Sequence, residues 1–231
     1  MQSTGHSGAT TMAGGIIRLA IFFGLLGAIA FASAGTLNWP MMWAFLIFYL
    51  GMMTINVPLM DPGLLEERLH PKEGVKVWDK WLTGCGLSLL FPIILVVAGL
   101  DYGRFHWSLI PPWVSVTAFG FYLLGTALSL WALYTNRFFS RYVRIQTERG
   151  HCVITDGPYR FVRHPGYVGV TVATLTLPVA LGSWWALLLA LVSLATLLVR
   201  TALEDRTLHE ELEGYIEYAG RVRYRLIPGV W

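Results

Sequence analysis

Charged side chains are scarce in this chain of 231 residues. Asp, Glu, Lys and Arg together make up 13% of the sequence, whereas hydrophobic residues make up 55%. A soluble domain carries about 25% charged residues. The shortage excludes an ordinary soluble domain and predicts a polytopic integral membrane protein. We expect an all-α fold built on transmembrane helices.

Motifs that would bind a metal or a nucleotide phosphate are also missing. The two cysteines form neither a disulfide framework nor a zinc pattern, and no HExxH or paired CxxC occurs. The chain has no P-loop, no G-x-G-x-x-G after a strand and no βαβ alternation. These absences argue against a protein-bound metal and exclude the soluble nucleotide-binding folds. The net charge of +3 is unevenly spread and does not indicate a nucleic-acid partner.

Long apolar runs dominate what is present. Residues 1–14 are rich in Ser, Thr and Gly and are predicted to be disordered. About six transmembrane helices follow, the last two forming a tight hairpin that is broken at Leu177-Pro178 and Gly182-Ser183. We divide the rest of the chain into a four-helix transmembrane region, 15–134, and a catalytic region, 135–231. The predicted spans lie near residues 16–34, 41–60, 81–100, 113–134, 167–181 and 184–203.

The positive charges gather in three polar segments, 61–80, 135–166 and 200–231. With six spans all three fall on one side of the membrane, and they hold fifteen of the seventeen Lys and Arg residues. Only Arg104 is placed on the other side. By the positive-inside rule this distribution predicts that the polar segments, including a C-terminal cofactor-binding region, lie in the cytoplasm.

The end of the first span offers an alternative to retention in the membrane. Ala32-Ser33-Ala34 resembles a signal-peptidase site. Arg18 is the only Lys or Arg before it and the apolar run is long, so we expect the span to stay in the protein. The expected location is the inner membrane of a bacterium, with the active site at the cytoplasmic face.

The sequence GPYRFVRHPGYVG, at residues 157–169, is the most informative stretch. It places prolines, glycines and cations at the start of an apolar run, where polar groups are costly unless they are used. Arg163 and His164 are adjacent donors at a predicted helix N-terminus, a suitable place to hold a carboxylate or phosphate. The alternatives are a lipid-phosphate anchor for Arg163 and a structural hydrogen bond for His164.

Two segments precede this stretch. Residues 136–146 alternate arginines with aromatic or aliphatic residues, which is also typical of a segment that rests on lipid headgroups. Residues 150–158 form a short, apolar, strand-like piece closed by a turn. Such a piece can offer backbone groups to the edge of an adenine-like ring. The backbone groups meant are those of His151, Cys152, Val153 and Ile154.

Ionisable side chains also end the last span. Arg200 and Glu204 are four residues apart and share one helix face. Glu204 and Asp205 are suited to face a cationic centre such as a sulfonium, and Arg200 is suited to hold an anionic acceptor. The alternative is an ordinary ion pair at a solvated helix end. Glu66-Glu67 are expected to lie on a solvated charged helix.

Three blocks of the last hundred residues resemble one enzyme superfamily. The Arg-His-Pro-x-Tyr-x-Gly pattern that begins at Arg163 is similar to the motif of the isoprenylcysteine carboxyl methyltransferase and phospholipid methyltransferase superfamily. The loop from Asn136 to Gly150 and the acidic pair Glu204-Asp205 resemble its other blocks in the expected order. The second acidic residue of the family is usually Glu, and here it is Asp.

The resemblance implies an integral membrane methyltransferase that uses S-adenosylmethionine. The implied acceptor is lipophilic, either an isoprenylcysteine-type carboxylate or a lipid amine, and the remaining partners are membrane lipids. The implied catalytic residues are Glu204, Arg200 and Arg163. The implied cofactor-binding residues are His151, Cys152, Val153, Ile154, Tyr159, Arg163, His164, Tyr167, Glu204 and Asp205.

Roles for several of these residues also follow from the resemblance. Arg163 and His164 would bind the carboxylate of the cofactor, and Glu204 would lie near the sulfonium or orient the acceptor. Arg200 would orient an acceptor carboxylate. Two other functions stay open: a membrane sterol- or enone-type reductase that docks a nicotinamide dinucleotide, and a non-catalytic protein that binds anionic lipid.

Overall fold

The structure is a computed structural model that describes residues 21–70 and 72–231. Within these two ranges the chain forms helices and turns without a β-strand, so the all-α prediction is confirmed. The predicted disorder of residues 1–14 lies outside the described residues. An apolar helix at Ile21–Ala34 comes first. The elements after it are α2 (Pro40–Leu59), α3 (Pro62–Leu69), α4 (Val77–Trp81), η1 (Leu82–Ser88), α5 (Leu90–Gly99), η2 (Leu100–Phe105), α6 (Pro112–Thr135), η3 (Thr147–Arg149), η4 (Gly157–Arg160), α7 (Pro165–Ala180), α8 (Trp184–Glu211) and α9 (Tyr215–Arg221).

Among the described residues, four helices are long and apolar enough to cross a membrane. Three of them are single elements, namely α2, α6 and α8. The fourth, Val77–Phe105, is a rod of 29 residues in which the π-helical stretch η1 joins α4 to α5 and the π-helical stretch η2 follows α5. The helices Ile21–Ala34 and α7 are apolar but shorter. The chain is therefore an integral membrane protein, and the count of six spans stays a prediction.

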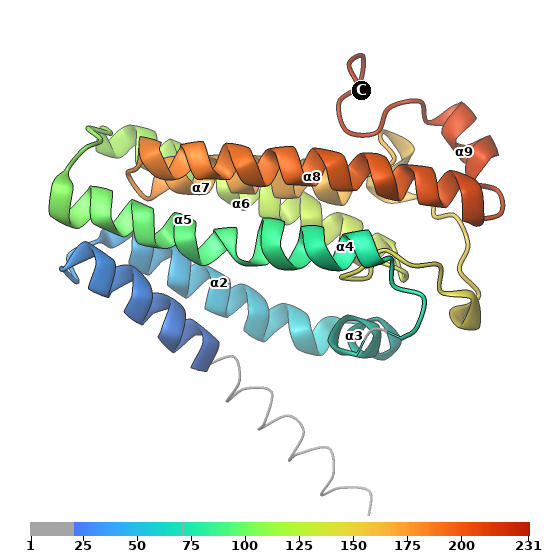
Figure 1. The fold of residues 1–231 in the computed structure, drawn as a ribbon, viewed down its shortest axis with the longest axis horizontal. Helices are drawn as coiled ribbons and strands as arrows, with labels where there is room; N and C mark the ends of the chain where they lie inside the picture. Colours follow the sequence, from blue (N-terminus) through green and yellow to red (C-terminus); the bar gives the residue numbers. More distant parts are fainter. Residues whose placement is uncertain (1–20, 71) are drawn as a thin grey trace, which may run out of the picture.

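The turn between α7 and α8 lies where the sequence predicts it. Gly182 has a left-handed φ of 89°, which a residue with a side chain rarely adopts. Ser183 then caps α8, since its Oγ accepts a hydrogen bond of 3.0 Å from the backbone N–H of Ala186. The buried Asp101 accepts a bond of 2.5 Å from the same hydroxyl and ties this turn to the rod that contains α5. From here α8 runs the length of the molecule beside α5 (Figure 1).

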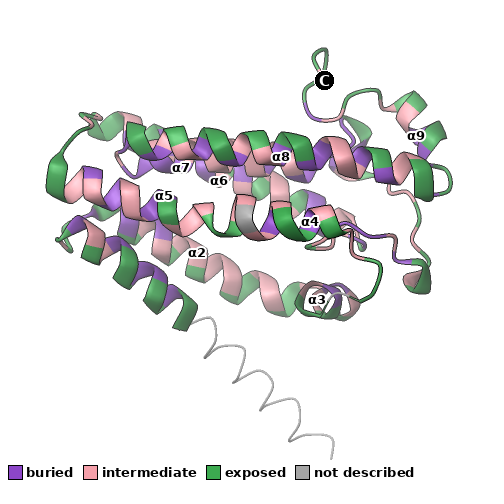
Figure 2. Ribbon diagram, viewed as in Figure 1, coloured by how far each residue is buried: buried purple, intermediate pink, exposed green. Residues whose placement is uncertain are grey.

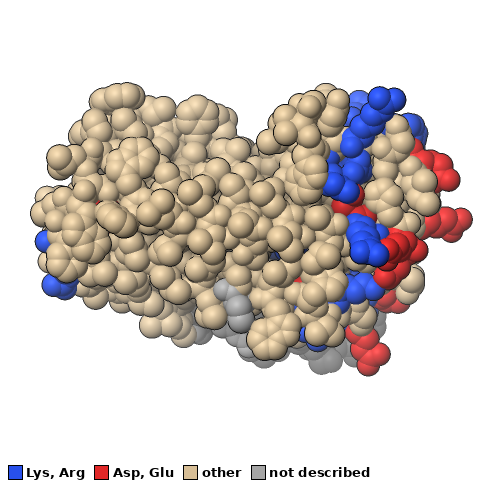
Figure 3. Space-filling view, turned by 45° about the horizontal axis from the view of Figure 1, so that its top comes forward, with Lys and Arg blue, Asp and Glu red and all other residues tan. Residues whose placement is uncertain are grey.

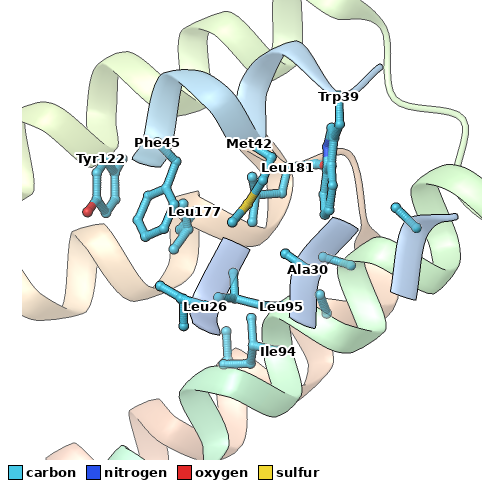
Figure 4. Close-up of a cluster of buried hydrophobic side chains, with 14 residues drawn as sticks. Leu26, Ala30, Trp39, Met42, Phe45, Ile94, Leu95, Tyr122, Leu177 and Leu181 are labelled. Atoms are coloured by element: carbon cyan, nitrogen blue, oxygen red, sulfur yellow. The ribbon is translucent and has the colours of Figure 1, made fainter. Parts of the chain in front are cut away.

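The apolar core lies between the helices, while exposed residues follow their outer faces (Figure 2). Figure 4 shows Met42 and Phe45 of α2 pointing toward Leu95 of α5 and Leu181 after α7. Trp39 closes one end of this cluster, and its ring nitrogen donates a bond of 3.1 Å to the carbonyl of Leu181. Because lipid tails are as apolar as these side chains, close packing rather than exclusion from water holds such helices together.

The closest helix pair is α6 and α7, which meet at two glycines. A Cβ on Gly125 would lie 2.7 Å from the carbonyl oxygen of Gly169, and a Cβ on Gly169 would lie 2.4 Å from the carbonyl oxygen of Gly125. Small residues at such a crossing let the two backbones approach each other. Gly169 belongs to the motif at 157–169, so this part of the motif serves helix packing.

Charged side chains gather at one end of the molecule (Figure 3). This end holds α3, the start of α4, the end of α8 and α9 (Figure 1). At the opposite end Arg104 donates to the carbonyls of Ser33 (2.7 Å) and Ala32 (2.8 Å), which end the first described helix. The fold thus places the three polar segments of the sequence together, at one end of an apolar bundle.

The glycine crossing generates a stability prediction. We expect Gly125→Ala and Gly169→Ala each to lower the free energy of unfolding by about 1–3 kcal/mol, because each added methyl group meets backbone of the facing helix. Thermal unfolding in detergent, followed by circular dichroism, measures the loss. Gly120→Ala on α6 is the matched control, since its added methyl group would meet no atom within 4 Å. Equal melting temperatures for the three variants would contradict the close approach of α6 and α7 at Gly125 and Gly169.

Candidate functional site

A cavity of about 870 Å³, including its open mouth, lies at the charged end. Its wall comes from the loop 136–146, the extended segment 151–154, the start of α7, the last turns of α8, and α9. Ten of the predicted site residues line it, namely His151, Cys152, Val153, Ile154, Tyr159, Arg163, His164, Tyr167, Arg200 and Glu204.

Asp205 is the one predicted residue that does not line the cavity. Its carboxylate is fully buried behind the wall and accepts hydrogen bonds from side chains of three segments. Arg163 donates two of them, at 2.8 and 3.1 Å, from the segment before α7. Tyr215 of α9 donates at 2.9 Å and Arg225 of the tail donates at 2.7 Å. One carboxylate therefore holds the motif, α8, α9 and the tail together.

Arg163 and His164, which the sequence predicts to bind the cofactor carboxylate, both face Asp205. The third nitrogen of Arg163, Nη1, donates to the carbonyls of Val222 (2.9 Å) and Arg223 (2.6 Å). His164 places Nε2 3.1 Å from Asp205 and lies parallel to the ring of Tyr167. All three guanidinium nitrogens of Arg163 therefore form hydrogen bonds. Of the nitrogens in these two side chains, only Nδ1 of His164 has no partner among the described residues.

A second buried ion pair underlies the loop 136–146. Arg144 donates to Glu67 at 2.6 and 2.8 Å, and the two side chains are 2% and 1% exposed. Although burial opposes it, the hydrogen bond from Arg144 lowers the pKa of the Glu67 carboxyl below its usual range. The expectation of a solvated helix is therefore wrong for Glu67, which docks α3 on the loop, whereas Glu66 is exposed. A buried carboxylate without a partner would be far too costly.

A third buried pair joins α4 to α8. Arg200 donates to Asp79 at 2.6 and 3.2 Å, and a further bond of 2.8 Å goes to the carbonyl of Arg141. Asp79 also accepts 2.7 Å from the backbone N–H of Val143. The alternative of an ordinary pair between Arg200 and Glu204 is therefore wrong. The shared helix face is real, because both side chains line the cavity.

Glu204 is the only acidic residue, among those the structure describes, that lines the cavity. It is half-buried and accepts a short hydrogen bond from the hydroxyl of Tyr167. Within the described ranges no Lys, Arg or His forms an ion pair with it. The three arginines of the wall, by contrast, each have a buried carboxylate of their own. The cavity therefore contains one carboxylate that forms no ion pair of its own among the described residues.

Neutral rings complete the wall. Burial raises the pKa of the phenols of Tyr159, Tyr215 and Tyr218, so all three are neutral at pH 7. Burial, with the charges of Arg144 and Arg149, lowers the pKa of His151 to about 4, so that imidazole is neutral as well. Rings of this kind attract a cation through their faces.

Sequence reasoning missed two carboxylates of this site, Glu67 and Asp79. Asp79 stands at the start of an apolar span, where an acidic residue is costly and therefore informative. That position was a usable signal. Glu67 carries no comparable signal, because α3 is polar and its partner Arg144 lies 77 residues further along the chain.

Comparisons with known proteins match the part of the chain that supplies much of the cavity wall. The model of the isoprenylcysteine carboxyl methyltransferase (ICMT) family matches residues 116–210. A protein-S-isoprenylcysteine O-methyltransferase of Schizosaccharomyces pombe is 32% identical over 120 residues, which are 50% of this chain and 51% of that protein. Protein-S-isoprenylcysteine O-methyltransferase B of Arabidopsis thaliana is 30% identical over 142 residues, 59% of this chain and 70% of that protein.

A solved structure agrees with these relatives. The structure of a eukaryotic intramembrane Ras methyltransferase, ICMT, has a similar fold, with a TM-score of 0.53 and 19% identity. The similarity covers 92% of this chain and 75% of that one. This chain thus spans about half the length of the yeast relative and most of the length of the plant relative. From the matched region and the extent of the plant match, the chain belongs to the isoprenylcysteine carboxyl methyltransferase family.

Proposed function

We propose that this protein is an integral membrane O-methyltransferase that uses S-adenosylmethionine and methylates the carboxylate of an isoprenylcysteine-type acceptor. Membership of the family favours this function over the reductase and lipid-binding alternatives. The names of both curated relatives specify an O-methyltransferase, which favours the carboxylate over a lipid amine.

One observation carries the proposal: among the described residues Glu204 forms no ion pair, in a cavity whose three arginines are all paired. A site of this kind attracts an organic cation, and the sulfonium of S-adenosylmethionine is such a cation. The rings of Tyr159 and Tyr167 line the same cavity and add cation–π attraction. The anionic end of the cofactor would lie at His164, whose Nε2–H donates to Asp205 and whose Nδ1 must also carry a proton to donate to a carboxylate. The backbone of 151–154 would meet the adenine edge.

S-adenosylmethionine supplies a methyl group whose bond to sulfur breaks as a carboxylate oxygen attacks the carbon, leaving an ester and a neutral thioether. The residues of the chain have no proton to move in this step, since a carboxylate needs no general base. Their work is to place the two reactants in line and to exclude water. Arg200, held by Asp79 at 2.6 Å, is positioned to orient the acceptor carboxylate.

We place the cavity at the cytoplasmic face of the bacterial inner membrane. The positive charges of the sequence and the charged end of the molecule coincide, which is the arrangement that the positive-inside rule predicts (Figure 3). The two shorter apolar helices, Ile21–Ala34 and α7, would complete six spans. A lipophilic acceptor would then reach the cavity from the bilayer.

The sulfonium contact generates the first test of this function. We expect calorimetry in detergent to show saturable binding of S-adenosylmethionine, tighter than binding of the neutral thioether S-adenosylhomocysteine. Glu204→Gln should weaken sulfonium binding by about tenfold or more, since a bond to a charged group is worth about 1.5–3 kcal/mol, and should remove the preference. His164→Ala should weaken the binding of both ligands.

The control for this test is Glu210→Gln, which neutralises an exposed carboxylate of the same helix. It should leave both affinities unchanged. Binding of a reduced nicotinamide dinucleotide in place of S-adenosylmethionine would indicate the reductase, and a sulfonium preference that survives Glu204→Gln would contradict the role of Glu204.

Asp205 generates a second prediction, because its contacts indicate that it positions other residues and does not touch the cofactor. We expect Asp205→Asn to lower the free energy of unfolding by about 3–5 kcal/mol, the cost of breaking a buried ion pair. Thermal unfolding measures this loss, and Glu213→Gln, which neutralises an exposed carboxylate nearby, should cause none. An unchanged melting temperature for Asp205→Asn would show that the carboxylate does not hold the segments together.

A further inference from the structure

Arg200 and Glu204 carry opposite charges on one face of α8, yet they form no ion pair with each other. Both side chains line the cavity. Residues four apart on a helix are neighbours, so an arginine and a glutamate at this spacing ordinarily attract each other. Glu204 is half-buried, and less water screens the attraction there than at an exposed surface. Other residues of the site must therefore keep these two charges apart.

Asp79 binds the guanidinium of Arg200 from behind the cavity wall. Its carboxylate is fully buried and accepts bonds of 2.6 and 3.2 Å from Nε and Nη2 of Arg200. The backbone N–H of Val143 donates a further bond of 2.7 Å to Asp79 and fixes the carboxylate in place. The charge of Arg200 is thus balanced by a group outside the cavity. Its Nη1 has no hydrogen-bond partner among the described residues and stays available to an acceptor carboxylate.

Tyr167 contacts both members of the separated pair. Its hydroxyl donates a hydrogen bond to Glu204, and the guanidinium carbon of Arg200 lies 5.3 Å from the centre of its ring. The ring face attracts the cation while the hydroxyl holds the carboxylate. A neutral hydroxyl leaves the negative charge of Glu204 in place, whereas a bond from Arg200 would cancel it. Tyr167 therefore orients Glu204 without neutralising it.

We propose that Asp79 is a positioning residue for cofactor selection. By holding Arg200, it keeps the negative charge of Glu204 available to the sulfonium of S-adenosylmethionine. This inference rests on the proposed function. Without the charge of Asp79, the nearly buried guanidinium of Arg200 has lost its counter-ion, and Glu204 is the carboxylate that lies on the same helix face. A residue that touches neither reactant thus determines how strongly the site prefers a cationic cofactor.

The test compares the affinities of the full chain in detergent for S-adenosylmethionine and for neutral S-adenosylhomocysteine. Their ratio is the sulfonium preference, which we expect to be about tenfold or more in wild type. Asp79→Asn should reduce the ratio to near parity, because Arg200 then neutralises Glu204. The double variant Asp79→Asn, Arg200→Gln should regain the preference, since no cation remains to pair with Glu204. A purely structural role for Asp79 would weaken both ligands alike and leave the ratio unchanged.

The matched control is Asp101→Asn. Asp101 is as fully buried as Asp79, but it accepts its hydrogen bonds at the other end of α8, where Ser183 donates to it. This variant should destabilise the protein and keep the sulfonium preference. Loss of the preference in Asp101→Asn as well would show that it responds to stability rather than to charge, and would overturn the inference.

Tyr167→Phe keeps the test decisive if Asp79→Asn fails to fold. It retains the ring and removes only the hydroxyl, so Glu204 is released and can turn toward Arg200. We expect the sulfonium preference to fall severalfold and to recover when Arg200→Gln is added. A preference that stays at the wild-type level in folded Asp79→Asn, or in Tyr167→Phe where Asp79→Asn does not fold, would overturn the inference.

Wild type, measured in the same experiment, separates the two levels of the proposal. Absence of a sulfonium preference in wild type would contradict the proposed role of Glu204, and with it the role of Asp79. A preference that is present in wild type and persists in the variants would contradict the role of Asp79 alone.

Discussion

The site depends on buried pairing between arginines and carboxylates whose partners come from distant parts of the chain. Asp205 is the most connected of these groups, and Arg144 with Glu67 and Arg200 with Asp79 repeat the same interaction. Such pairs add little net stability, yet losing one partner leaves a buried charge that costs about 3–5 kcal/mol. They therefore enforce one arrangement of the loop 136–146, the motif and the tail around the cavity.

The pairing also determines the electrostatics of the cavity. Although three arginines contribute to its wall, their charges are balanced by carboxylates behind it. The one acidic side chain of the described residues that lines the cavity is that of Glu204, which forms no ion pair. A cavity with one such carboxylate suits the cationic cofactor that we propose.

Much of this could be read from the sequence, because the signals are local. The apolar runs predict the helices, and the segments 151–167 and 200–204 each carry several wall residues within a short stretch. The pairing of charges could not be read, because it depends on tertiary contacts. Arg200 lies 121 residues from Asp79 and only four from Glu204, yet the distant carboxylate offers a buried, two-bonded pair, whereas a local helix pair is weak.

The length of α8 has a mechanical consequence. The helix is 28 residues long, or roughly 42 Å at 1.5 Å per residue, and it carries Arg200, Glu204 and Asp205 near one end. Its other end is anchored through Ser183 to Asp101. A long helix accommodates changes in bilayer thickness by tilting as a rigid rod. Any tilt of α8 would therefore move these three residues together, as parts of one rigid helix, rather than one side chain at a time.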